Sequence, residues 1–125
     1  MDDDGSPREA ALTQLRKGVA PYCILALLAD RERYGYDLAR ELAQREVVAG
    51  AGSVYPLLSR LQSDGLIRSA WREPDEGMPR KYYRLTAEGQ VALDRFRALW
   101  PSFVASISEI LQVGGATEGG PRNAP

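Results

Sequence analysis

A one-sided helical pattern that ends at a glycine and leads directly into an alternating segment constrains the fold of this chain more than any other feature. Over residues 53–64 the apolar side chains recur at helical spacing, at Val54, Leu57, Leu58 and Leu61. The other faces carry polar side chains, and the first turn has no acidic residue. Gly65 follows, where a glycine at positive φ can end a helix. A short helix with one buried face and one acid-poor face is what a DNA groove accepts.

The segment after this helix has the pattern of a β-hairpin. Residues 67–73 and 80–85 alternate, and residues 74–79 form a turn-rich tip. In the first strand Ile67 and Trp71 fall opposite Arg68 and Arg72, and in the second Tyr83 and Leu85 fall opposite Arg80, Tyr82 and Arg84. The four arginines can therefore share one basic face that reaches phosphates or a minor groove. For Trp71, Tyr82 and Tyr83 we expect packing in the core or hairpin rather than stacking on bases.

The positions of the helices before residue 53 are predicted from apolar runs and from the residues that interrupt them. We expect a short helix at 12–17, a buried helix at 18–29 with Pro21 in its first turn, a charged turn at 30–33 and a helix ending near Arg45. Val47 and Val48 are a candidate stub of strand. Three helices and a two-stranded wing make a winged helix-turn-helix.

The C-terminal segment has a heptad pattern of its own. Its large apolar residues alternate three and four apart: Leu93, Phe96, Trp100, Phe103, Ile107 and Ile110. Thr86 is the expected N-cap, and Pro101 should bend the helix just below Trp100. The pattern fits a dimer interface, packing against the first helix of the same chain, or both.

The expected fold class is therefore mainly α with a small β-hairpin, a winged helix-turn-helix plus a long C-terminal dimerisation helix. Residues 1–10 should form a disordered acidic arm, 11–86 the DNA-binding domain, 87–113 the dimerisation helix and 114–125 a disordered tail.

Composition bears on function mainly by exclusion. The chain of 125 residues has no histidine and one cysteine, Cys23, so Cys/His zinc sites and His-based triads are excluded. Nucleotide-binding and hydrolase motifs are absent, and we expect no enzyme activity, no cofactor and no metal. No stretch is long enough for a membrane span, and the acidic start is unlike a signal peptide, so a cytoplasmic protein is expected. The net charge of −1 hides a basic run in residues 80–84.

These patterns together resemble the PadR family of bacterial transcriptional regulators. The resemblance covers about residues 18–111 and rests on residues 24–28, 34–38, 52–61, 65–67 and 79–89. The family's Gly-Thr-Leu-Tyr-Pro element stands here as Gly52-Ser53-Val54-Tyr55-Pro56. Its wing motif Gly-Gly-Arg-Pro-Arg-Lys-Tyr-Tyr stands as Gly77-Met78-Pro79-Arg80-Lys81-Tyr82-Tyr83, with one basic wing residue missing or replaced by Met78.

The resemblance implies a winged-helix dimer that represses transcription and releases DNA when an effector binds. The single C-terminal helix resembles a short branch of the family, some members of which bind flat aromatic compounds between paired tryptophans. Trp100 occupies a similar position, with Phe96 and Phe103 beside it. The residues expected to bind double-stranded DNA are Ser53, Tyr55, Pro56, Ser59, Arg60, Arg80, Lys81 and Arg84.

Two other functions are open on the sequence alone. The pI near 5.5 and the acidic arm fit a winged helix used for protein–protein contact. The other is a protein that binds or sequesters a small molecule without DNA activity. A steep salt dependence of DNA binding distinguishes a DNA-binding regulator from both alternatives.

Overall fold

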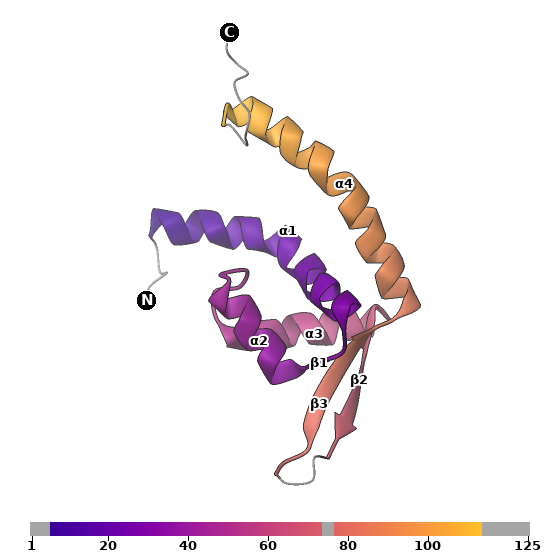
Figure 1. The fold of residues 1–125 in the computed structure, drawn as a ribbon. Coiled ribbons are helices and arrows are strands. Elements are labelled where there is room, and N and C mark those ends of the chain that lie inside the picture. The colour runs from indigo at the N-terminus through magenta and orange to yellow at the C-terminus, as the bar shows by residue number, and fades with distance from the viewer. Residues whose placement is uncertain (1–5, 74–76, 114–125) are drawn as a thin grey trace. The chain divides into compact units, whose positions relative to one another are not determined.

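The computed structural model describes residues 6–73 and 77–113 as four α-helices, a 3₁₀ turn and three short strands (Figure 1). In chain order these are α1 (Pro7–Asp30), β1 (Arg33–Tyr34), α2 (Gly35–Gln44), η1 (Ala51–Ser53), α3 (Val54–Ser63), β2 (Ile67–Arg72), β3 (Arg80–Leu85) and α4 (Ala87–Leu111). The residues up to Leu93 form one compact unit, and those from Asp94 form a second. The expected boundary at residue 86 therefore lies about two turns before the observed division.

The first unit is built around one apolar core. Fully buried side chains come from α1, α2, α3, β2 and the start of α4: Ile24, Leu25, Leu38, Leu42, Val54, Leu58, Ile67 and Leu93. The helical spacing expected for Val54, Leu58 and Leu61 is confirmed, since all three are buried. Leu93 was expected in a dimer interface, and that assignment is wrong because the side chain is 1% exposed within its own chain.

The N-terminal helix differs from the expectation. Residues 12–29 were expected as two helices, yet α1 is continuous and holds Pro21 well inside it. It begins at Pro7, because the Ser6 hydroxyl accepts the Glu9 N–H at 3.0 Å and a proline suits the first helical position. Residues 7–10 are thus helical rather than part of a disordered arm. Residues 1–5 and the expected tail at 114–125 lie outside the described residues.

The sheet has three strands in the order β1-β3-β2, all antiparallel. The third strand, β1, lies in the segment expected as a charged turn, where Arg33 pairs with Tyr83 and Tyr34 with Tyr82. Val47 and Val48, expected as a stub of strand, form none, and Val48 instead packs into the core. We call the β2–β3 hairpin the wing; its strands extend beyond the helices of the first unit (Figure 1).

The end of α3 and the start of α4 are joined by one hydroxyl. Thr86 caps α4 as expected, because its Oγ1 accepts the Gly89 N–H at 3.0 Å. The same hydroxyl donates to the carbonyl of Gly65 at 2.7 Å. Gly65 has φ +80°, and the Leu66 N–H donates to the Leu61 carbonyl at 3.0 Å, which is a Schellman ending for α3.

Among the described residues, no helix combines the length and apolarity that crossing a bilayer would need. In the same residues, no three Asp, Glu or Cys side chains gather as metal ligands.

Candidate nucleic-acid interface

The outer side of α3 is polar and free of carboxylates along the helix. Tyr55, Pro56, Ser59 and Arg60 are exposed, as expected from the spacing, and the first turn has no acidic residue. The buried side chains between them fix the rotation of the helix on the core. The four residues therefore present a surface that does not repel phosphate.

Ser53, also expected on this surface, is exposed and stands at the N-cap position of α3. Its hydroxyl donates to the Gly50 carbonyl at 2.7 Å, and the residue is the last of η1. It lines a small hollow of about 230 Å³. The walls of this hollow come from α1, the α2–η1 loop, η1 and α3, and they include Lys17, Pro21 and Val48. Ser53 thus precedes Tyr55 and Ser59 at the start of the same helix, with its hydroxyl bonded to the backbone.

The wing has two faces with different side chains. The register pairs Arg68 with Arg84 and Arg72 with Arg80, so the four arginines share one face, as the alternation predicts. Trp71 pairs with Lys81 on the other face, which near the helices is occupied by the buried side chains of Ile67 and Tyr83. We call these the arginine face and the inner face. Lys81 was expected beside Arg80 and Arg84. It lies on the inner face, whereas these two residues lie on the arginine face.

A hollow of about 470 Å³ joins α3 to the inner face of the wing. It brings together four of the eight expected DNA-binding residues, Tyr55 and Ser59 from α3 with Arg80 and Lys81 from β3. Its other lining residues are Tyr34, Gly35, Tyr36, Trp71, Pro79 and Tyr83. No acidic side chain is among the residues that line it, so its charge is positive. We call it the α3–wing hollow.

The environment of Tyr55 keeps its hydroxyl protonated. Partial burial, followed by the nearby phenols of Tyr34, Tyr83 and Tyr36, raises the pKa of Tyr55 above its ordinary value. A neutral phenol can donate a hydrogen bond to a base edge or a phosphate and has no charge to repel either. Tyr55 is therefore a neutral hydrogen-bonding contact at neutral pH.

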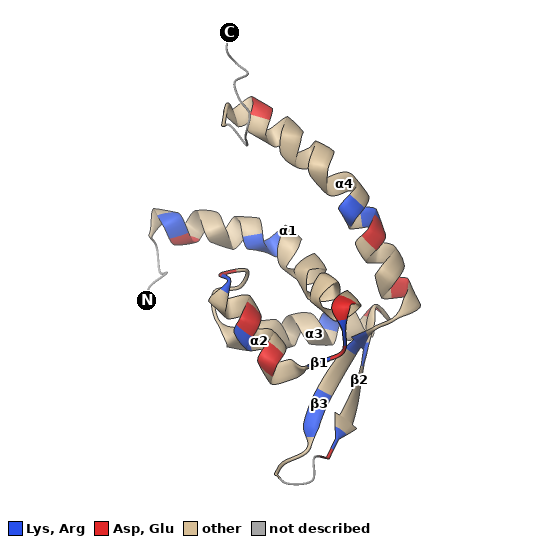
Figure 2. Cartoon of the chain, viewed as in Figure 1, with Lys and Arg blue, Asp and Glu red and all other residues tan. Residues whose placement is uncertain are grey.

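Aromatic rings hold the cations of the wing in place. The Lys81 ammonium lies 5.7 Å from the ring centroids of both Trp71 and Tyr83. Arg80 lies over Tyr34 at 4.9 Å, and Arg72 lies over Tyr82 at 4.7 Å. Arg72 also forms an ion pair with Glu32. Figure 2 shows Lys and Arg but no Asp or Glu on β2 and β3 themselves.

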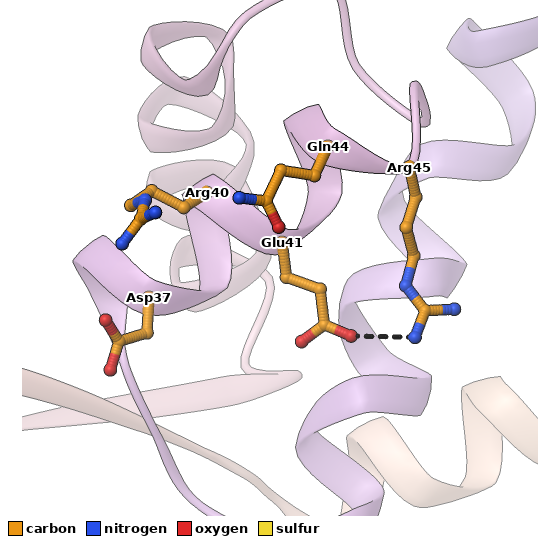
Figure 3. Close-up of a pocket in the computed structure, with 5 residues that line it drawn as sticks. All are labelled: Asp37, Arg40, Glu41, Gln44 and Arg45. Atoms are coloured by element: carbon orange, nitrogen blue, oxygen red, sulfur yellow. Dashed lines mark ion pairs between the residues drawn. The ribbon is translucent and has the colours of Figure 1, made fainter.

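The exposed side of α2 carries a third hollow, of about 370 Å³, whose lining holds acidic as well as basic side chains (Figure 3). Glu41 binds Arg45 at 3.0 Å and Arg33 at 2.9 Å, so its carboxylate is neutralised by partners from two segments. Asp37 adds a further negative charge to the lining. Arg40 and Arg45 balance the two carboxylates in this lining, so it lacks the excess of positive charge that phosphate binding favours.

The effector residues expected from the sequence lie in the second unit, on α4. The rings of Phe96 and Trp100 are 5.4 Å apart between centroids, and Trp100 is 41% and Phe103 60% exposed. Ile107 and Ile110 are also exposed. α4 continues through Pro101 as a single helix. The side chains expected to form an interface are thus uncovered, apart from Leu93 and the half-buried Phe96.

Sequence reasoning missed the aromatic part of the α3–wing hollow. Trp71 was expected to pack in the hairpin or core and is instead 66% exposed. The alternation of the strand could have indicated this. Trp71 follows Ile67 and Ser69 on the inner face of β2, and it lies beyond the end of the core. Tyr34 and Tyr36 could not have been found in this way, since their position depends on the pairing of β1 with β3.

Three comparisons with known proteins agree with this architecture. The model of the PadR-like transcriptional regulator family matches residues 24–95. The transcriptional regulator Rv3488 of Mycobacterium tuberculosis is 40% identical over 74 residues, which cover 59% of this chain and 68% of that protein. A PadR-like transcriptional regulator of Bacillus cereus has 34% identity and a TM-score of 0.70, over 81% of this chain and 99% of the other.

A second similar structure was solved with bound DNA. It is Bacillus subtilis PadR in complex with operator DNA, with 28% identity and a TM-score of 0.56 over 62% of this chain and 46% of that one. The expected fold class, a winged helix-turn-helix with a long C-terminal helix, is thereby confirmed. With its family model matched over more than half of its length, this chain belongs to the PadR-like family of transcriptional regulators.

Proposed function

We propose that this protein is a sequence-specific regulator that binds double-stranded DNA through the α3–wing hollow. The observation that carries the proposal is that the exposed side of α3 and the inner face of the wing meet in one hollow with two cations and no carboxylate in its lining. α3 would enter the major groove with Tyr55, Pro56, Ser59 and Arg60, and the wing would hold phosphates with Arg80, Lys81 and Arg84. The operator complex of the Bacillus subtilis relative supports this choice of ligand.

The test compares wild type with two variants on the DNA upstream of its own gene and on random duplex. Lys81→Ala should weaken binding to both and reduce the salt slope by about one, because it removes one phosphate contact. Tyr55→Phe should weaken binding to the upstream DNA more than to random DNA. Arg45→Ala, a charge change directly after α2 and outside the hollow, is the control. Absence of binding, or equal losses for Lys81→Ala and Arg45→Ala, would contradict the proposal.

We further propose that the protein acts as a homodimer joined through α4. The supporting observation is the row of exposed apolar side chains on this helix: Leu99, Trp100, Phe103, Val104, Ile107, Ile110 and Leu111. Burying such side chains contributes roughly 1.5–3 kcal/mol each, which exceeds the cost of association when several are buried. A dimer would hold two α3 helices about 34 Å apart, the spacing of successive major grooves. We expect such a regulator to act in the cytoplasm.

The regulatory sense we propose is repression that is released by a planar aromatic molecule. Trp100, with Phe96 and Phe103 beside it, would stack on the ligand at the dimer centre, and the ligand would release DNA by favouring a dimer with another α3 spacing. Titration with planar dyes should quench Trp100 fluorescence in a Trp71→Phe background. Unchanged dye affinity and unchanged DNA release in Trp100→Ala would exclude this site.

A further inference from the structure

Trp71 is exposed without a structural reason. Its side chain is 66% exposed, although its strand register places it on the same face as the buried Ile67. An indole on a hairpin costs free energy when it faces water, and most large apolar side chains of the first unit are buried. The position therefore points to a partner that covers the ring.

The surroundings of Trp71 identify the chemistry of that partner. The ring lines the α3–wing hollow together with Tyr55 and Ser59. The Lys81 ammonium lies 5.7 Å from its centroid, and Lys81 is the cross-strand neighbour of Trp71. The hollow thus offers a flat apolar surface directly beside a positive charge. In a nucleic acid, the sugar and the phosphate present an apolar ring directly beside a negative charge.

The alternative of a purely structural role for the ring is weaker. The ammonium of Lys81 also lies 5.7 Å from the Tyr83 ring, which is buried, so Lys81 is positioned without Trp71. Removing the indole therefore leaves Lys81 with one of its two aromatic partners. On the inner face the register places Lys81 directly opposite Trp71, with Ser69 and Tyr83 as the next pair toward the core.

We propose that Trp71 is a further DNA-contacting residue, whose indole packs on a deoxyribose at the edge of the minor groove while Lys81 binds the adjacent phosphate. This inference rests on the proposed function, because it needs a duplex in the α3–wing hollow. The apolar half of the contact adds affinity that does not depend on salt. It also places the wing against one particular sugar, which fixes how far along the duplex α3 reads.

The emission measurement uses the protein with Trp100→Phe, so that Trp71 is the single tryptophan, and the affinity measurements keep Trp100. A 30-base-pair duplex should change the emission of Trp71, whereas polyphosphate, which has charge but no sugar, should leave it unchanged. Trp71→Ala should weaken duplex binding about tenfold with an unaltered salt slope, because no charge is lost. Trp71→Phe should recover most of the affinity.

The matched control is Met78→Ala, since Met78 is a 79% exposed apolar residue on the same hairpin that does not line the hollow. Hydroxyl-radical footprinting, which reports exposed deoxyriboses, should lose one protected patch in Trp71→Ala and none in Met78→Ala. Equal affinities for these two variants, with normal binding by wild type, would overturn the role of Trp71 alone. A wild-type protein that binds no duplex would overturn the proposed function as well.

Discussion

Cys23 shows how burial controls the chemistry of one side chain. It lies on α1, half-buried beside the core, and burial raises the pKa of its thiol above its ordinary value. Because the thiolate is the nucleophile, we expect iodoacetamide to label the folded protein more slowly than the urea-unfolded protein at the same pH. The folded-state pH profile should also lie at higher pH. Equal labelling rates in the two states would contradict the assignment.

Gly89 is a second residue whose role follows from its immediate neighbours. A Cβ at this position would lie 2.1 Å from the Leu66 carbonyl oxygen and 2.6 Å from Leu85 Cδ1. Gly89→Ala should therefore lower the free energy of unfolding by about 1–3 kcal/mol, the usual cost of overpacking. Gly18→Ala, inside α1 with nothing within 4 Å of its Cβ, should raise it by up to about 1 kcal/mol. Urea denaturation measures both, and similar values for the two would contradict this account.

At the scale of elements, the wing places two like charges directly opposite each other. Arg68 faces Arg84 across the strands, and both are exposed. Arg84→Glu should convert the repulsion into an ion pair and raise the free energy of unfolding by about 0.2–1 kcal/mol. The same change should weaken DNA binding, because it places a carboxylate on the wing. Arg84→Gln separates loss of repulsion from gain of attraction; a less stable Arg84→Glu protein would contradict the argument.

The elements that could be predicted from the sequence are those with local signals. α3, the two wing strands and the Thr86 cap carry periodicity, a terminal glycine or a capping hydroxyl, and all three appear as expected. β1 has two residues and exists only because β3 pairs with it, so no local pattern could reveal it. α1 passes through Gly18 and Pro21 because Ala20 and Ile24 are buried on either side, a tertiary effect that outweighs local propensity.

The candidate site could also be predicted only in its local features. Exposure on α3 follows from its period, whereas the meeting of Tyr55 with Lys81 depends on how the wing is placed beside the helix. The separation of Lys81 from Arg80 and Arg84 was already implied by the alternation, since Lys81 falls in the same phase as Tyr83. The burial of Leu93 in the core could not be predicted from the heptad pattern. The same apolar stripe of α4 packs into the core at Leu93 and is exposed at the later heptad positions.

At the scale of the whole molecule, the proposed assembly depends on the exposed part of α4. Phe103→Asp combined with Ile107→Asp should give monomers, because a buried unpaired carboxylate opposes association. Sedimentation velocity measures the change, and circular dichroism checks that the first unit stays folded. Val91→Asp, at a 49% exposed position of α4 outside the heptad row, should remain dimeric. A double variant with the sedimentation coefficient of wild type would remove α4 as the interface.

The double hydrogen bond of Thr86 has a consequence for genetics. Its hydroxyl joins the carbonyl that follows α3 to the first turn of α4, and Gly89 lies against the neighbouring Leu66 carbonyl. A screen for alleles that fail to regulate should therefore recover substitutions at Thr86 and Gly89, although neither residue lines the α3–wing hollow. Such alleles would be scored as DNA-binding mutants. Thr86→Ser keeps the hydroxyl and should regulate normally, whereas Thr86→Val lacks the hydroxyl and should fail to regulate.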